Sequence, residues 1–135
     1  MTRDTLAADM GKLADAVLSD ARWQRDDLGV SVLGMLLYGF ALAKGRIVML
    51  LDLEDINAAV LHVMTTRIGA ASKWSSGMIE DADRSALDAA YHPGQHELIS
   101  AGQSYLGIQE RAAILDNVFA NIRSVRRRAD LGRRA

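Results

Sequence analysis

Leu28–Ala43 reads LGVSVLGMLLYGFALA, a run of sixteen residues without a charged side chain. A helix that is apolar on all sides must be surrounded by protein or by lipid. A membrane-spanning helix needs about 20 apolar residues, whereas Asp26 and Asp27 precede this run and Lys44 and Arg46 follow it. We therefore expect a buried central helix over residues 28–43 and no membrane span.

Three glycines interrupt this apolar run: Gly29, Gly34 and Gly39. Glycine inside a helix costs conformational stability. Its presence indicates either a kink or a position where a neighbouring helix approaches closely. We interpret these glycines as sites of close packing within the core.

Amphipathic segments flank the central run on both sides. The first carries an apolar stripe at helical spacing, at Leu6, Met10, Leu13 and Val17. Similar stripes follow after the central run. The helices expected from these patterns are residues 3–21, 28–43, about 53–67, 78–91, 95–106 and 108–128.

Several signals indicate where these helices begin and end. Asp26 or Asp27 can cap the central helix, and Asp52 can cap the next one. Residues 70–77 are expected to form a loop, with Ser75 or Ser76 capping the helix that follows. Residues 92–94, His-Pro-Gly, are expected to stop that helix. Residues 47–51 are consistent with a short strand or with the approach to the next helix. We favour a helix or an extended connector, because an isolated strand has no partner to pair with.

The sequence thus predicts an all-α protein, a single irregular bundle of five to six helices around the central apolar helix. Its 135 residues suffice for one domain with a real core, and the basic C-terminal end is expected to fray from about residue 129. No cysteine is present, which excludes disulfides and thiolate metal sites. Asp4 and Asp9 stand where a signal peptide would be apolar, so a cytoplasmic location is expected.

Neither catalysis nor a cofactor is predicted. His92 and His96 have the four-residue spacing of metal ligands on a helix, but Pro93 and Gly94 stand between them. The carboxylates gather near expected helix starts, where the helix dipole already favours them. We expect no catalytic residue and no metal ligand.

Exposed acidic residues and two tryptophans are the candidate partner-binding residues. The acidic candidates are Asp52, Glu54, Asp55, Glu80, Asp81 and Asp83. Trp23 and Trp74 both fall in expected connecting segments, and an exposed tryptophan is a good interface anchor. A tryptophan folded back over the end of the bundle is the alternative.

The C-terminal end of the chain is basic. Residues 1–100 hold nine basic and fourteen acidic residues, net −5, whereas residues 101–135 have a net charge of +4. Arg123, Arg126, Arg127 and Arg128 are the candidate phosphate contacts. No aromatic residue lies within this run, and positive charge at a helix C-terminus is also favoured by the dipole alone. A solvated helix end is therefore the alternative interpretation, and nucleic acid is not the expected partner.

In size, helical character and lack of catalytic motifs the chain resembles the small all-α immunity proteins of bacterial polymorphic-toxin systems. The resemblance lies in general character and no motif carries it. It implies a non-catalytic module that binds a cognate toxin domain and occludes its active site. Two alternatives stay open: a nucleic-acid-associated helical regulator that uses the C-terminal arginines, and a small helical metal-dependent enzyme. Homo-oligomerisation, which would cover part of the central helix, stays open too.

Overall fold

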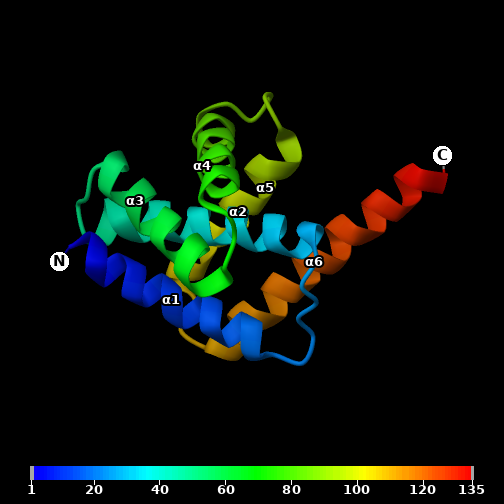
Figure 1. Cartoon of the computed structure of the whole chain (residues 1–135), viewed down its shortest axis with the longest axis horizontal. Helices are drawn as coiled ribbons and strands as arrows, with labels where there is room; N and C mark the ends of the chain where they lie inside the picture. The colour runs from blue at the N-terminus through cyan, green and yellow to red at the C-terminus, as the bar shows by residue number, and fades with distance from the viewer. Residues whose placement is uncertain (1, 135) are drawn as a thin grey trace.

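The structure, a computed structural model, describes residues 2–134, and the side chains of residues 2–132 (Figure 1). The described residues form six α-helices and no strand, which confirms the predicted all-α bundle. The helices are α1 (Arg3–Ser19), α2 (Asp27–Ala43), α3 (Leu53–Val63), α4 (Ser72–Leu87), α5 (Pro93–Ser104) and α6 (Arg111–Arg134).

Helix α2 is the centre of the bundle, as predicted. Figure 1 shows it running horizontally through the middle of the molecule, and it contacts each of the other five helices. The Asp26 side chain caps it by accepting a hydrogen bond from the Gly29 N–H at 2.8 Å. The segment Asp27–Val48 is long and apolar enough to cross a membrane, but 72% of its apolar window is buried inside the bundle. The rest of the protein therefore covers most of this helix.

The closest packing of α2 is against α5. Gly39 of α2 lies directly over the backbone of Ile99, and Gly102 of α5 lies directly over the backbone of Leu36. A third glycine, Gly34, lies against the side chains of Met64 and Met78. The prediction of close packing at the central glycines is thus confirmed for Gly39 and Gly34.

Helix α4 begins earlier than predicted. Residues 70–77 were expected to form a loop, but α4 starts at Ser72, and its N-cap is Ala71, which makes no side-chain capping bond. Ser75 does not cap the helix, because its side chain is fully buried one turn before Ile79. Serine occupies the first core position of α4. Because this residue is polar, the apolar stripe did not reveal the first turns of the helix.

The predicted stop signal at Pro93 is instead the start of α5. Proline is favoured in the first turn of a helix because its missing N–H would be unpaired there anyway. The His92 ring accepts a hydrogen bond from the Gln95 N–H at 3.0 Å and so takes the capping role. Helix α4 itself ends at Leu87, four residues before the predicted end.

Residues 47–51 form no strand. Helix α2 continues into a wide helical turn, Lys44–Val48, in which the N–H of Met49 bonds to the carbonyl of Lys44. The chain then runs irregularly to Asp52, and Leu50 adopts a left-handed φ of 56°. A similar wide turn, Met64–Ile68, follows α3 and ends at Gly69, where the left-handed φ of 77° suits glycine.

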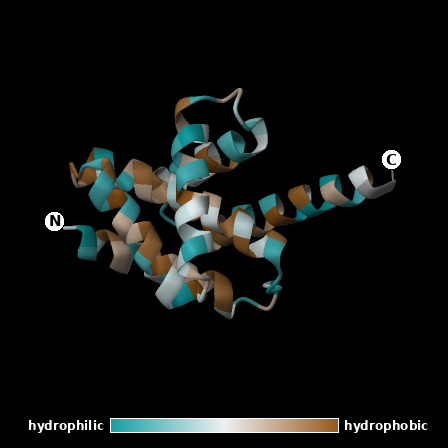
Figure 2. Cartoon of the chain, turned by 45° about the horizontal axis from the view of Figure 1, so that its top comes forward, coloured by the Kyte–Doolittle hydropathy of each residue, from teal (hydrophilic) through white to brown (hydrophobic). Residues whose placement is uncertain are grey.

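Helix α6 projects beyond the body of the bundle (Figure 1). Its last buried side chain is Ile122, whereas the helix continues to Arg134. Figure 2 shows hydrophobic residues recurring along this helix as far as its projecting part. The segment from residue 129 onward, for which fraying was predicted, is helical up to Arg134.

Asp20 and Arg22 join the turn after α1 to α6. The Arg22 guanidinium bonds to Asp20 at 2.9 and 3.0 Å and to Asp116 at 2.9 Å. The side-chain bond from Arg22, followed by the backbone N–H of Arg22, lowers the pKa of Asp20 from its ordinary 3.8 to about 2.

We expect this pKa shift to make the protein sensitive to acid. A carboxyl with a lowered pKa stabilises the folded state above its unfolded pKa, and this contribution is lost as the pH falls from about 4 to about 2. Urea denaturation at about pH 5 and about pH 2.5 measures the loss. Asp20→Asn should lose less stability than the wild type over this interval, and an equal loss in both proteins would contradict the prediction.

Candidate interaction groove

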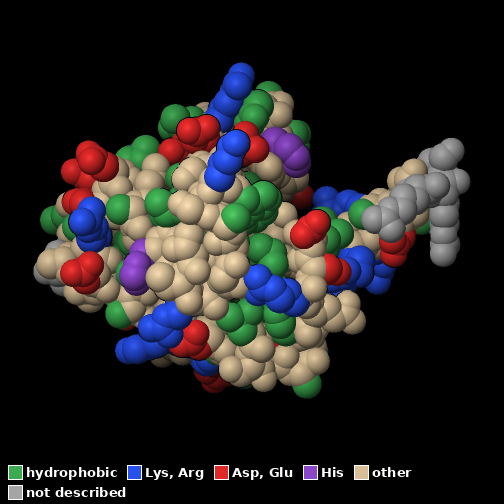
Figure 3. Space-filling model, in the orientation of Figure 1, with side chains coloured by type: hydrophobic (Ala, Val, Ile, Leu, Met, Phe, Trp, Pro, Cys, Tyr) green, Lys and Arg blue, Asp and Glu red, His purple; other side chains and the backbone are tan. Residues whose placement is uncertain are grey.

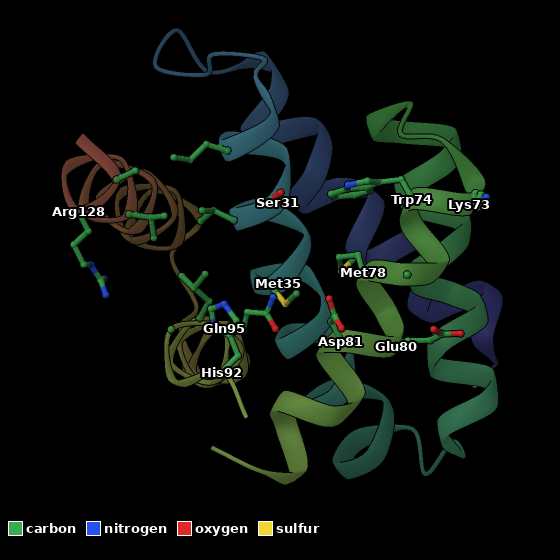
Figure 4. A pocket seen from close by; sticks show the side chains of 17 residues that line it. Ser31, Met35, Lys73, Trp74, Met78, Glu80, Asp81, His92, Gln95 and Arg128 are labelled. Atoms are coloured by element: carbon green, nitrogen blue, oxygen red, sulfur yellow. Dashed lines mark hydrogen bonds between the residues drawn. The ribbon is translucent and has the colours of Figure 1, made fainter. Parts of the chain in front are cut away.

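A groove with a volume of about 1010 Å³ opens between four helices, with α2 at its floor (Figure 4). It is called the groove below. Its walls come from α4 on one side and from α5 and α6 on the other. The residues that line it include Val32, Met35, Trp74, Gly77, Met78, Glu80, Asp81, Leu98 and Arg128.

The floor of the groove is apolar and is continuous with the core. Val32, Met35 and Leu98 belong to the buried core, and each also faces the groove. Figure 4 shows Met35 of α2 and Met78 of α4 approaching each other across the floor. Methionine side chains are flexible and polarisable, and they adapt to differently shaped apolar partners.

Trp74 is the largest exposed apolar side chain at the groove. It lies in the first turn of α4, with 41% of its surface exposed, one helical turn before Met78. Figure 4 shows its indole ring extending from α4 toward α2. Tryptophan contributes large binding energies when a partner covers it, so the groove offers an anchor beside an apolar floor.

Charged residues of both signs stand at the edges of the groove. Lys73, Glu80 and Asp81 lie on α4, and Arg128 lies on the opposite wall. The Asp81 carboxylate accepts a hydrogen bond from the Tyr91 hydroxyl at 2.9 Å, which raises the pKa of that tyrosine. Lys73 and Glu80 make no ion pair with any described residue, whereas Arg128 lies 3.7 Å from the Glu97 carboxylate.

The structure brings some of the candidate binding residues together and separates others. Trp74, Glu80, Asp81 and Arg128 all line the groove. Asp52, Glu54 and Asp55 lie at the start of α3, where Asp52 caps the helix through the Asp55 N–H at 2.9 Å. Trp23 is partly buried against the core, which is the folded-back alternative.

Asp83 points away from the groove, although it is only two residues after Asp81. Its carboxylate accepts hydrogen bonds from the Tyr38 hydroxyl at 2.5 Å and from the Asn57 side chain at 2.9 Å. It lies beside a second, smaller hollow of about 400 Å³. Burial, and then this hydrogen bond, raises the pKa of Tyr38, so the hydroxyl stays protonated and donates.

The four candidate phosphate-binding arginines do not act as one set. Arg126 bonds to Asp26 at 2.5 Å, which lowers the pKa of that aspartate and ties α6 to the N-terminus of α2. Arg128 lies beside Glu97, whereas Arg123 and Arg127 have no ion pair among the described residues. Figure 3 shows acidic and basic side chains interspersed over the visible face, with no large surface of one sign.

His92 and His96 serve the local structure of α5. His92 caps the helix, and the His96 ring makes a hydrogen bond to the Ser85 carbonyl at 2.8 Å. Within the described part of the chain, no group of three or more histidine, aspartate or glutamate residues comes together to hold a metal ion. The arrangement of side chains in the groove is suited to binding through apolar contact and charge.

The chain matches no protein-family model, and no curated protein and no solved structure shows significant similarity to it.

Several groove residues were not predicted from the sequence. Met35, Gly77 and Leu98 carry no signal that separates a groove position from an ordinary core or surface position. Trp74 and Met78 are four residues apart, so an earlier start for α4 would have placed both on one helical face.

Proposed function

We propose that this protein is a non-catalytic protein-binding module and that the groove receives an apolar helix of its partner. The observation that carries the proposal is the combination of an apolar floor with an exposed tryptophan and charges of both signs at the edges. Two turns of a helix about 10 Å wide occupy roughly 850 Å³. That volume fits the groove of about 1010 Å³.

The mode of binding follows from general recognition physics. Amphipathic helices bind hydrophobic grooves by inserting residues three or four apart in their sequence. Met35 and Met78 would contact these residues, and Trp74 would cover one side of the helix. Glu80 and Lys73 at the edge would favour a partner with complementary charges, which speeds and orients docking more than it adds affinity.

We propose a cognate bacterial toxin domain as the partner, which the protein neutralises by occluding its active site. The support for this partner is the resemblance in size and helical character to immunity proteins. The groove adds a surface through which such an inhibitor could hold its target. A large neighbouring gene with a variable C-terminal toxin domain, whose product co-purifies with this chain, is the expected finding.

Gly77→Leu is the sharpest test of the groove. An added Cβ at Gly77 meets no atom within 4 Å, so the fold should accept the substitution while the leucine fills the groove. Tagged wild type purified from the native host should capture the toxin-domain protein, and Gly77→Leu should not. Gly132→Leu is the matched control, because Gly132 of α6 is equally open and lies outside the groove.

Trp74→Ala gives a graded measurement on the same complex. Loss of a central tryptophan costs about 2 kcal/mol of binding free energy, which is a rise of about thirtyfold in Kd. Calorimetry with the captured partner measures this change. If Gly77→Leu and Trp74→Ala both bind like the wild type, the groove is not the binding site.

A further inference from the structure

A second exposed surface lies away from the groove, at the other end of α2. Four large aliphatic side chains there are open to solvent: Ile47 is 70% exposed, Val48 43%, Leu50 84% and Leu87 89%. They are called the apolar rim below. Ile47 and Leu87 come from segments forty residues apart in the sequence and line the same hollow of about 400 Å³. None of the four lines the groove.

The apolar rim includes a strained residue. Leu50 has a φ of 56°, in the left-handed region that a branched side chain such as leucine rarely adopts. Backbone strain of this kind persists only where surrounding contacts fix it, and it collects at functional sites. At Leu50, this strained backbone conformation accompanies an aliphatic side chain that is exposed to solvent.

A buried side chain and two hydrogen bonds hold the apolar rim in place. Met49, between the exposed Val48 and Leu50, is buried in the core. The Leu51 N–H bonds to the Gly45 carbonyl at 2.8 Å, which closes the loop. Beneath the rim, the Tyr38 hydroxyl bonds to Asp83 and so connects α2 to α4. The rim is therefore a preformed surface.

We propose that the apolar rim binds the apolar rim of a second copy of this chain, related by a two-fold axis. In such a contact each patch must be complementary to itself. The rim meets this condition in charge, because Arg46 lines its hollow and Glu54 follows Leu53, another lining residue. Neither Arg46 nor Glu54 has an ion pair among the described residues. In the proposed dimer, Arg46 of each copy would pair with Glu54 of the other.

The composition of the rim also favours a second copy. The contacts between identical subunits are more apolar than other protein interfaces, and the rim consists of aliphatic residues without an aromatic anchor. An anionic membrane surface fits less well, because Asp52, Glu54 and Asp55 stand together at the start of α3 and repel negative charge. The dimer leaves the groove free, so this proposal is independent of the one for the groove.

Light scattering coupled to size-exclusion chromatography tests the dimer. The wild type should elute as a dimer. Leu87→Asp should raise the dimer dissociation constant by about a hundredfold, because the dimer would then bury two unpaired charges, one from each subunit. Leu131→Asp is the matched control, an exposed leucine on α6 that is 57% exposed and outside the rim. Circular dichroism should show unchanged folding for both variants, as expected for exposed sites.

A charge exchange tests the two-fold geometry. Arg46→Glu and Glu54→Arg should each weaken the dimer, and the double variant should restore it. A monomeric wild type at its highest soluble concentration overturns the proposal, whether or not it binds phosphatidylglycerol vesicles or another protein. A dimer that resists Leu87→Asp, or one that Leu131→Asp dissociates equally, also overturns it.

Discussion

Gly39→Ala is expected to destabilise the protein by about 3 kcal/mol or more. An ideal Cβ at Gly39 would stand 2.1 Å from the carbonyl oxygen of Ile99 and 2.9 Å from its carbonyl carbon. Inserting a methyl group into a packed core usually costs 1–3 kcal/mol. The loss of stability for Gly39→Ala should lie at or above the upper end of this range. The clashing atoms belong to the Ile99 backbone, so no side-chain rotation can relieve the clash. Helix α5 must move as a whole.

Gly102→Ala should behave in the same way, since its Cβ would stand 2.1 Å from the carbonyl oxygen of Leu36. The two glycines are the two halves of one helix crossing. A single separation of α2 from α5 relieves both clashes, so the double variant should lose less stability than the sum of the two single losses. Urea denaturation of the three variants measures this coupling.

Gly77→Ala is the matched control for both glycines. It is also a helical glycine, but a Cβ there meets nothing within 4 Å. Alanine is the better helix former by about 0.5–1 kcal/mol, so Gly77→Ala should raise the midpoint of denaturation. If Gly39→Ala were as stable as the wild type, α2 and α5 could not cross as closely as the structure shows.

The sequence predicted this crossing in part, because the apolar run and its glycines are local features. A helix with no charged side chain over residues 28–43 has to be central, and glycines in it indicate close packing. The partner at the crossing was not predictable. Gly102 lies in an ordinary amphipathic segment, and only the folded chain shows that it meets Leu36.

The errors in helix boundaries have a common physical cause. Ser75 of α4 has a polar side chain but is fully buried. Proline disrupts a helix at interior positions but is favoured in the first turn, where Pro93 lies in α5. In both cases the tertiary position decides how the residue acts. Hydrophobic periodicity carries no information on that position. The predicted starts of α4 and α5 therefore both lie later in the sequence than the observed starts.

The groove was even less accessible to sequence reasoning, because four helices contribute to it. Trp74, Glu80 and Asp81 were predicted as binding residues on the grounds of exposure and charge, and they share the groove. Asp83 was predicted on the same grounds, yet its helical position turns it toward α2 and α3. A difference of two residues along α4 thus separates a groove residue from a structural one.

Asp83→Ala is therefore expected to lower stability strongly, by about 3 kcal/mol. The substitution removes the acceptor of two hydrogen bonds, from the Tyr38 hydroxyl at 2.5 Å and from the Asn57 amide at 2.9 Å. Tyr38 is almost fully buried, and within the described part of the chain the Asn57 side-chain oxygen already has no hydrogen-bond partner. A donor left without an acceptor in such a place costs about 1–3 kcal/mol, and two donors lose theirs together.

Three comparison variants separate this explanation from a general effect of removing charge. Asp81→Ala, on the exposed face of the same helix, should change stability by less than about 0.5 kcal/mol. Asp83→Asn keeps an acceptor for Tyr38 and should cost about 1 kcal/mol. Tyr38→Phe removes the hydroxyl itself, so no buried donor is left without an acceptor, and it should also cost about 1 kcal/mol. Equal losses for Asp81→Ala and Asp83→Ala would show that the buried hydrogen bonds contribute nothing, because both variants remove one negative charge from α4.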